Sequence, residues 1–146
     1  MKGLHGIIFS YEKKTGLREL IEGYEGVVMG ISAGTMNAAE TVYAQPEEDG
    51  ESAPSFRRFY PGLGLTEINI CPHYQEVIEK NMTVDGIPIS PDITAADSMG
   101  HTFHVFPDGT YIYKDETEYA ILGECYRYRD GILERLSKDG ERIDLK

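Results

Sequence analysis

A short apolar run bounded by glycines constrains the fold of this chain more than any other feature of its sequence. The run is Gly26–Gly30, and it leads directly to Ser32. A strand that is apolar at every position is typical of a parallel sheet in which both faces are covered. The small helix-forming residues of Ala33–Val42 predict a helix that begins directly after Ser32. We therefore expect a strand–turn–helix unit and an α/β fold class.

The turn between this strand and this helix has the pattern Gly-x-Ser-x-Gly, from Gly30 to Gly34. In such a turn the serine adopts a strained backbone conformation, and the flanking glycines Gly30 and Gly34 avoid side-chain clashes. The backbone N–H of Ala33 is the natural donor to a developing oxyanion. The pattern therefore indicates a catalytic nucleophile at Ser32, with a simple helix N-cap as the alternative.

A nucleophilic serine needs a base, and the chain has four histidines, His5, His73, His101 and His104. His73 follows the predicted strand Leu65–Cys71, and open α/β sheets place their sites at such strand ends. The alternative for His73 is a capped histidine at a strand end. The spacing of His101 and His104 on one strand, without a third ligand, argues against a metal site.

A carboxylate is also expected, because it would orient the imidazole of the base. The candidates are Asp92, Asp97 and Asp108, and the residues by themselves do not choose between Asp108 and Asp97. Asp108 lies in a Pro-Asp-Gly sequence, so turn formation alone also explains it.

The remaining patterns predict an α/β part over residues 1–80 and a hairpin-rich part over 81–146, together one domain. In the first part we expect strands at Leu4–Phe9 and Leu65–Cys71, and helices at Gly16–Ile21 and Tyr74–Lys80. We expect a surface loop at Gln45–Phe56. In the second part, one hairpin is expected from Thr102–Phe106 and Thr110–Tyr113, and another from Glu118–Tyr128 and Ile132–Leu136. A Lys138–Gly140 turn then precedes a last short strand.

The charge and the apolar content exclude several classes of function. The net charge of −11 repels phosphate backbones and anionic lipid, so we expect neither nucleic-acid nor membrane partners. No apolar run reaches the roughly 18 residues of a membrane span, and Met1–Ser10 lacks a signal-peptide core, so we expect a cytoplasmic protein. We expect Cys71 and Cys125 to be reduced, half-buried thiols.

Three segments, taken together and in order, resemble the dipeptidase E and cyanophycinase family of serine peptidases, peptidase family S51. They are Gly30–Gly34, Leu63–Tyr74 and Pro107–Ile112. The resemblance implies a fold similar to class I glutamine amidotransferases, a three-layer sandwich, with a Ser-His-Glu triad in that chain order. It assigns the nucleophile to Ser32, the base to His73 and one oxyanion donor to Ala33. Asp108 stands where the family commonly has Glu, and the resemblance implies no cofactor.

Two departures from the family pattern shape the functional expectations. Family members carry a further N-terminal half with a glycine-rich loop that supplies the other oxyanion donor, so we expect an N-terminally truncated relative. Between Arg58 and Arg127 there is no arginine to hold an acidic substrate side chain.

The leading hypothesis is a serine peptidase that hydrolyses short peptides. The alternative is a catalytically impaired, truncated member that acts as an interaction or orphan domain, and a weaker one is an anion-binding module. Because exposed sheet edges associate, we expect a homodimer.

Overall fold

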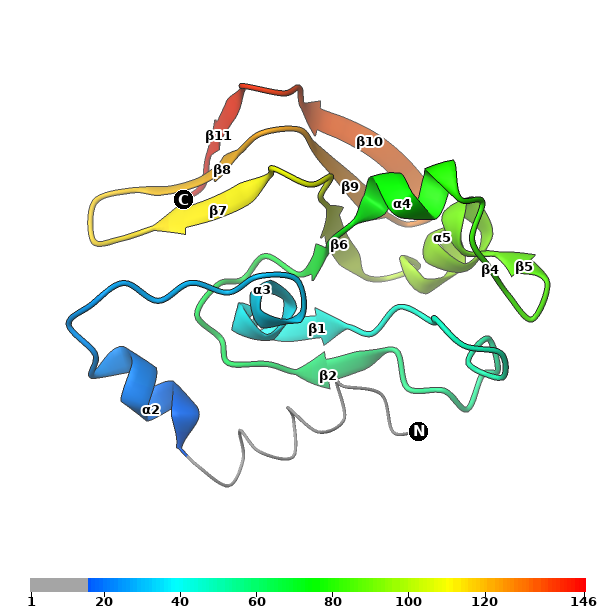
Figure 1. Ribbon diagram of the computed structural model, residues 1–146, viewed down its shortest axis with the longest axis horizontal. Helices are drawn as coiled ribbons and strands as arrows, with labels where there is room; N and C mark the ends of the chain where they lie inside the picture. The colour runs from blue at the N-terminus through cyan, green and yellow to red at the C-terminus, as the bar shows by residue number, and fades with distance from the viewer. Residues whose placement is uncertain (1–15) are drawn as a thin grey trace. The chain divides into compact units, whose positions relative to one another are not determined.

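Short helices and small sheets make up the described part of the chain, which is of the mixed α/β class (Figure 1). The computed structural model describes residues 16–146, so the strand predicted over Leu4–Phe9 lies outside the described residues. The chain divides into two compact units. The first comprises the residues up to Ala44 together with Arg57–Ile70, and the second comprises Gln45–Phe56 and Cys71–Lys146. None of the helices in residues 16–146 has the length and apolar character that crossing a membrane requires.

The described part of the first unit has the helix that its sequence predicts at Gly16–Ile21, and it departs from prediction after that helix. Its elements are α2 (Leu17–Glu22), α3 (Ala33–Ala38), β1 (Thr41–Tyr43) and β2 (Phe59–Pro61). The helix α2 ends at Gly23, as expected. The helix expected over Ala33–Val42 stops at Ala38, because the β-branched and aromatic residues that follow pair antiparallel with β2 instead.

The apolar run Gly26–Gly30 is not the buried strand that its composition predicts. It belongs to no strand of the structure, and the side chains of Val27, Met29 and Ile31 are 89%, 77% and 76% exposed. A strand is buried on both faces only where neighbouring strands and helices cover it. Within residues 16–146 no strand pairs with this run, so its apolar side chains face solvent.

The core of the first unit lies around β1. Val42 and Tyr43 are fully buried, and the ring of Tyr43 packs against that of Phe59 with a centroid distance of 5.5 Å. The Tyr43 backbone N–H donates to the Asn69 side chain at 3.0 Å. The predicted strand Leu65–Cys71 is reduced to β3 (Ile70–Cys71), because the Thr66 hydroxyl accepts the Ile68 N–H and turns the chain.

The second unit contains the remaining elements. The helical ones are α4 (Tyr74–Glu79), η1 (Ile89–Ile93) and α5 (Thr94–Asp97); the strands are β4 (Thr83–Val84), β5 (Ile87–Pro88), β6 (Thr102–Val105), β7 (Tyr111–Lys114), β8 (Tyr119–Leu122), β9 (Cys125–Arg129), β10 (Ile132–Ser137) and β11 (Arg142–Asp144). One sheet has the order β10-β9-β6-β3, another the order β11-β8-β7, and β4 pairs with β5. The helix predicted at Tyr74–Lys80 and the Gln45–Phe56 loop are confirmed.

Of the two predicted hairpins, the first is wrong and the second is confirmed at its turn, while the strand predicted over Glu118–Tyr128 is divided into β8 and β9 of different sheets. Strands β9 and β10 pair antiparallel across Asp130 and Gly131, whose φ values of 49° and 79° suit a tight two-residue turn. Strands β6 and β7 do form, but β6 pairs with β9 and β7 pairs with β8. Local sequence specifies strand and turn here, whereas the partner depends on contacts distant in sequence.

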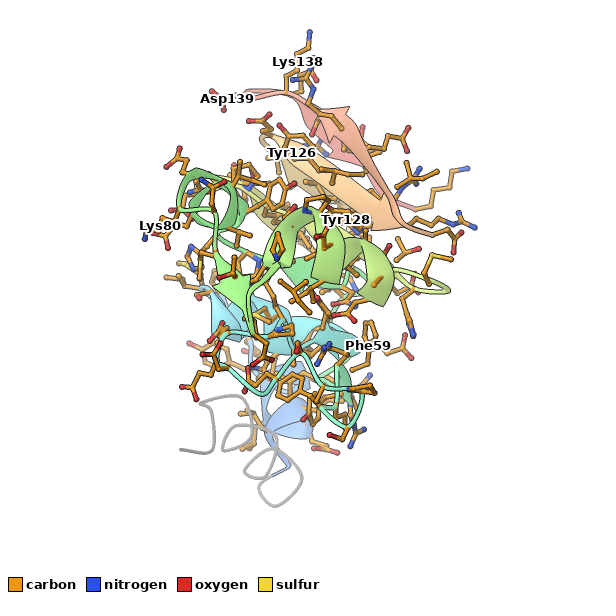
Figure 2. The ribbon with its side chains drawn as sticks, turned by 90° about the vertical axis from the view of Figure 1, so that its right-hand side faces the viewer. Phe59, Lys80, Tyr126, Tyr128, Lys138 and Asp139 are labelled. Carbon is orange, nitrogen blue, oxygen red and sulfur yellow. The ribbon has the colours of Figure 1, made fainter. Side chains whose placement is uncertain are left out.

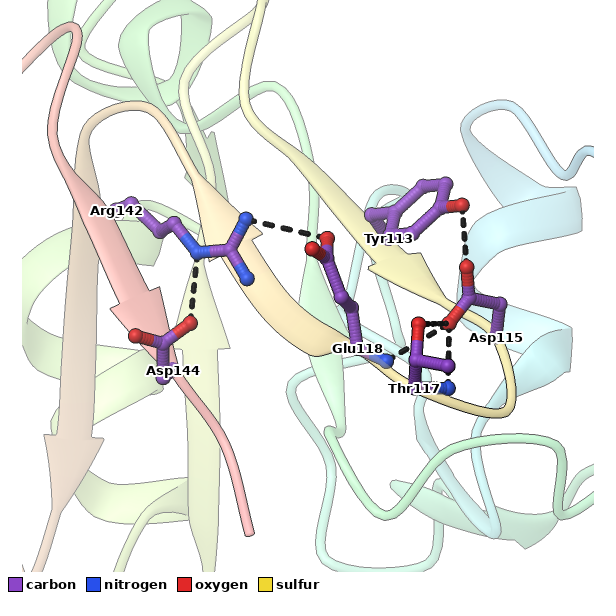
Figure 3. A network of polar contacts seen from close by, with 6 residues as sticks. All are labelled: Tyr113, Asp115, Thr117, Glu118, Arg142 and Asp144. Carbon is purple, nitrogen blue, oxygen red and sulfur yellow. Dashed lines mark hydrogen bonds and ion pairs between the residues drawn. The ribbon is translucent and has the colours of Figure 1, made fainter.

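Strand β7 instead forms its hairpin with β8 through a turn organised by Asp115 (Figure 3). One carboxylate oxygen accepts the Tyr113 hydroxyl at 2.6 Å. The other accepts the backbone N–H groups of Thr117 and Glu118, each at 2.7 Å. These hydrogen bonds hold the pKa of Asp115 well below its usual range, with the Tyr113 hydroxyl the largest cause.

Apolar side chains from helices and strands form the core of the second unit. Val77, Val84, Ile89 and Ile93 form one buried cluster. Tyr128 of β9, which Figure 2 labels, packs against Phe103 of β6 with ring centroids 5.6 Å apart. Both cysteines are free, but they are buried rather than half-buried as expected. Burial raises the pKa of both thiols to about 12, which makes them unreactive.

Candidate active site

Ser32 stands at the N-cap position of α3 with φ 52° and ψ −116°. Positive φ is uncommon for serine, and backbone strain of this kind concentrates at functional sites. The turn is closed by Gly34 N–H donating to the Ile31 carbonyl at 2.9 Å and Met36 N–H donating to the Ser32 carbonyl at 3.1 Å. The Ser32 hydroxyl makes no capping hydrogen bond to the helix. This backbone conformation favours a strained turn over an ordinary serine N-cap, although residues 26–31 do not form the strand that precedes the serine in a nucleophile elbow.

The two glycines that flank Ser32 have different surroundings. A Cβ at Gly30 would stand 2.6 Å from the carbonyl carbon and oxygen of Gly34 and 2.8 Å from the Thr35 nitrogen. The Thr35 hydroxyl also donates to the Gly30 carbonyl at 2.6 Å. A Cβ at Gly34 would meet no atom of the described residues within 4 Å. Gly30 is thus required by the tight turn itself, and Gly34 leaves open space beside the start of α3.

His73 is held at the start of α4 in a left-handed conformation, with φ 58° and ψ 31°. Its Nδ1 lies 2.9 Å from the Asp108 Oδ1. A carboxylate only accepts hydrogen bonds, so Nδ1–H is the donor and Nε2 is left as the basic nitrogen. Both side chains are exposed, 46% for His73 and 62% for Asp108. The contact is what a general base and its orienting acid require.

Hydrogen bonds from the two residues directly after His73 tie α4 to the segment that carries Asp108. The Tyr74 N–H donates to the Phe106 carbonyl at 3.2 Å. The Asp108 N–H donates to the Gln75 Oε1 at 3.0 Å. Sequence reasoning missed Gln75, and its position two residues after the candidate base was the only available signal.

The buried side of α4 is fixed by a chain of hydroxyl groups. The Tyr74 hydroxyl lies 3.3 Å from the Ser90 hydroxyl, which lies 3.0 Å from the Tyr128 hydroxyl. The Tyr74 ring also packs against Tyr126 with a centroid distance of 5.7 Å (β9, Figure 2). Burial is the main cause that raises the pKa of Tyr74, so its hydroxyl stays protonated and bonded.

The other candidates of the sequence analysis lie elsewhere. Asp92 is in η1 and Asp97 is the last residue of α5. His104 is on β6 with a buried Nδ1 that has no hydrogen-bond partner, and burial followed by Arg127 lowers its pKa to about 4. His5 lies outside the described residues. In the part of the chain that the structure describes, no cluster of three or more ligating side chains is arranged to hold a metal ion.

Comparison with known protein families then identifies the group to which this chain belongs. The model of peptidase family S51 matches residues 10–120, which is well over half of the chain. The chain belongs to peptidase family S51. No curated protein and no solved structure matches it. The match to family S51 spans Ser32, His73 and Asp108, so these three candidate residues lie within the matched part.

Proposed function

We propose that this chain is a serine peptidase of the dipeptidase E type that hydrolyses short peptides, with Ser32, His73 and Asp108 as its triad. The observation that carries the proposal is the 2.9 Å contact between His73 Nδ1 and Asp108 Oδ1 in a member of a peptidase family. The strained backbone conformation of Ser32 supports its proposed role as the nucleophile.

In the proposed reaction the Ser32 hydroxyl attacks the peptide carbonyl while His73 Nε2 takes its proton. Asp108 holds the ring and stabilises the imidazolium that forms. The Ala33 N–H donates to the oxyanion, and Gly34, at whose Cβ position no described atom lies within 4 Å, leaves open space beside the start of α3. The protonated His73 then gives its proton to the leaving amine. Water, activated by the same nitrogen, hydrolyses the acyl-enzyme and restores Ser32.

A fluorophosphonate probe tests this directly, because it reacts covalently with an activated serine and reports the modified residue by mass spectrometry. We expect labelling at Ser32 of the wild type, none in Ser32→Ala, and unchanged labelling in Ser55→Ala, an exposed serine of the Gln45–Phe56 loop. Asp108→Asn should slow labelling by about 10⁴-fold, the typical loss when the imidazole takes the wrong tautomer. An unlabelled, folded wild type would end the proposal.

A second candidate is a catalytically impaired family member that acts as an interaction domain. The observation that favours it is the exposure of Val27, Met29 and Ile31 directly before the elbow, because contiguous exposed apolar side chains mark interaction sites. This candidate predicts that Ser32→Ala leaves every measurable property unchanged. Reaction of Ser32 with the probe would refute it.

We also propose a homodimer with a cytoplasmic location and a class I glutamine amidotransferase-like, three-layer arrangement. The exposed apolar run supports self-association, since burying it would remove it from water. Sedimentation velocity tests the dimer. A strict monomer across a wide concentration range would contradict it.

A further inference from the structure

The contact between His73 and Asp108 is too exposed to hold itself in place. Its two side chains are 46% and 62% exposed. Ion pairs at such positions gain little, because water screens the charges and the side chains lose conformational freedom. A fixed geometry therefore has to come from the backbone that carries Asp108.

That backbone is a turn held at three points. Within the turn, the Thr110 N–H donates to the Pro107 carbonyl at 3.2 Å. Before it, the Phe106 carbonyl accepts the Tyr74 N–H, and Phe106 N–H itself donates to the Cys71 carbonyl at 2.9 Å. These bonds fix the entry to the turn. The backbone N–H of Asp108 itself is tied to α4 by a side chain, that of Gln75.

We propose that Gln75 is a positioning residue of the candidate site, which sets the Asp108 carboxylate against His73; this inference rests on the proposed function. Its Oε1 accepts the Asp108 N–H at 3.0 Å, so the backbone of the acid is tied to the first turn of the helix whose N-cap is His73. The backbone positions of both His73 and Asp108 are thereby fixed relative to the same helix, α4. Gln75 does not touch the reacting atoms and acts through Asp108.

The reach of the side chain matters to this role. Gln75 is half-buried on α4, and its amide spans the gap to the turn. Asparagine would be shorter by one C–C bond, about 1.5 Å, and would leave the Asp108 N–H to water. Because that N–H is at the surface, water satisfies it, and the fold loses little. What is lost is the position of the carboxylate.

The test compares Gln75→Met, which keeps the length but has no acceptor, with Gln75→Glu, which keeps an acceptor oxygen. Glu79→Met, one turn further along α4 and exposed, is the matched control. The first readout is the tautomer of His73, from the ring ¹⁵N shifts of histidine-labelled full-length protein at about pH 8, where an ordinary histidine is neutral. The second is the rate of fluorophosphonate labelling of Ser32.

We expect the wild type, Gln75→Glu and Glu79→Met to show the Nδ1–H tautomer of His73, and Gln75→Met to show a mixture of the two tautomers. Labelling of Gln75→Met should be slower by roughly 10- to 100-fold, the cost of misplacing a catalytic group by about 1 Å. Gln75→Asn gives the same test should Gln75→Met fail to fold. An unchanged His73 tautomer in a folded acceptor-free variant overturns the inference. If the wild type is not labelled, the proposed function fails, and the tautomer comparison still decides the role of Gln75.

Discussion

Gly30→Ala and Gly34→Ala form a matched pair that tests whether the elbow geometry governs the reactivity of Ser32. The two substitutions add the same methyl group on either side of the same serine. At Gly30 the methyl would lie 2.6 Å from the Gly34 backbone, closer than the 3.0 Å that Cβ atoms essentially never go below. The atoms in its way are backbone, so the turn itself has to shift. At Gly34 nothing lies within 4 Å.

The expected magnitudes follow from these distances. Relieving the clash at Gly30 costs about 1–3 kcal/mol of stability, as overpacking usually does. A resulting displacement of Ser32 approaching 1 Å lowers reactivity by up to about 10²-fold. Gly34→Ala places a better helix former in α3 and should be neutral or stabilising by up to about 1 kcal/mol.

The assays are urea unfolding and the rate of fluorophosphonate labelling at Ser32. Equal stability and equal labelling of Gly30→Ala and wild type would refute the reasoning, since the turn would then not be tight. Slow labelling of a fully stable Gly34→Ala would show instead that the space beside Gly34 is occupied by the reacting probe, as expected for a substrate-facing glycine.

Two further predictions concern groups with shifted pKa values. Because burial lowers the pKa of His104 from 6.5 to about 4, the unfolded chain binds a proton that the folded chain does not between these values. Stability should therefore fall by about 2 kcal/mol from pH 7 to pH 5 relative to His104→Gln, measured by urea unfolding, and an identical pH dependence in both proteins would contradict this. The pKa of Asp115 is depressed, so its stabilisation is present above the unfolded value of 3.8 and is lost as pH falls below it. Asp115→Ala should lower the unfolding temperature at neutral pH, with the difference from wild type shrinking below about pH 4; a constant difference would argue against the carboxylate.

Sequence patterns predicted those features of the fold that are decided within a few residues. The end of α2 at Gly23 and the tight turn at Asp130 and Gly131 are examples, because each depends on a backbone conformation that glycine or aspartate adopts easily. The same holds for the start of α3 directly after Ser32.

What the sequence failed to predict depends on partners distant along the chain. The sequence correctly predicted that β6 and β7 are strands joined by a turn. It predicted that they pair with each other, whereas β6 pairs with β9 and β7 pairs with β8. The composition of Gly26–Gly30 predicted burial, which composition alone cannot supply without neighbouring strands. The helix after Ser32 was expected to be longer because its residues have good helix propensity. It ends at Ala38 because the pairing of β1 with β2 outweighs that propensity.

In the candidate site, too, local features could be predicted from the sequence and contacts between distant segments could not. The strained turn at Ser32 is a local structure, set by Gly30 and by the helix that follows, and the sequence predicted this turn although not the loss of the strand before it. The choice of acid was not local: the residues by themselves left Asp97 and Asp108 open, the family resemblance pointed to Asp108, and a contact across 35 positions in the chain supports it. Gln75 belongs wholly to this second kind, because a glutamine on a short helix has no signature until its amide is seen to meet the Asp108 N–H. Strained turns are therefore easier to predict from sequence than hydrogen bonds between distant segments, since a strained turn demands particular residues and such a hydrogen bond demands only reach.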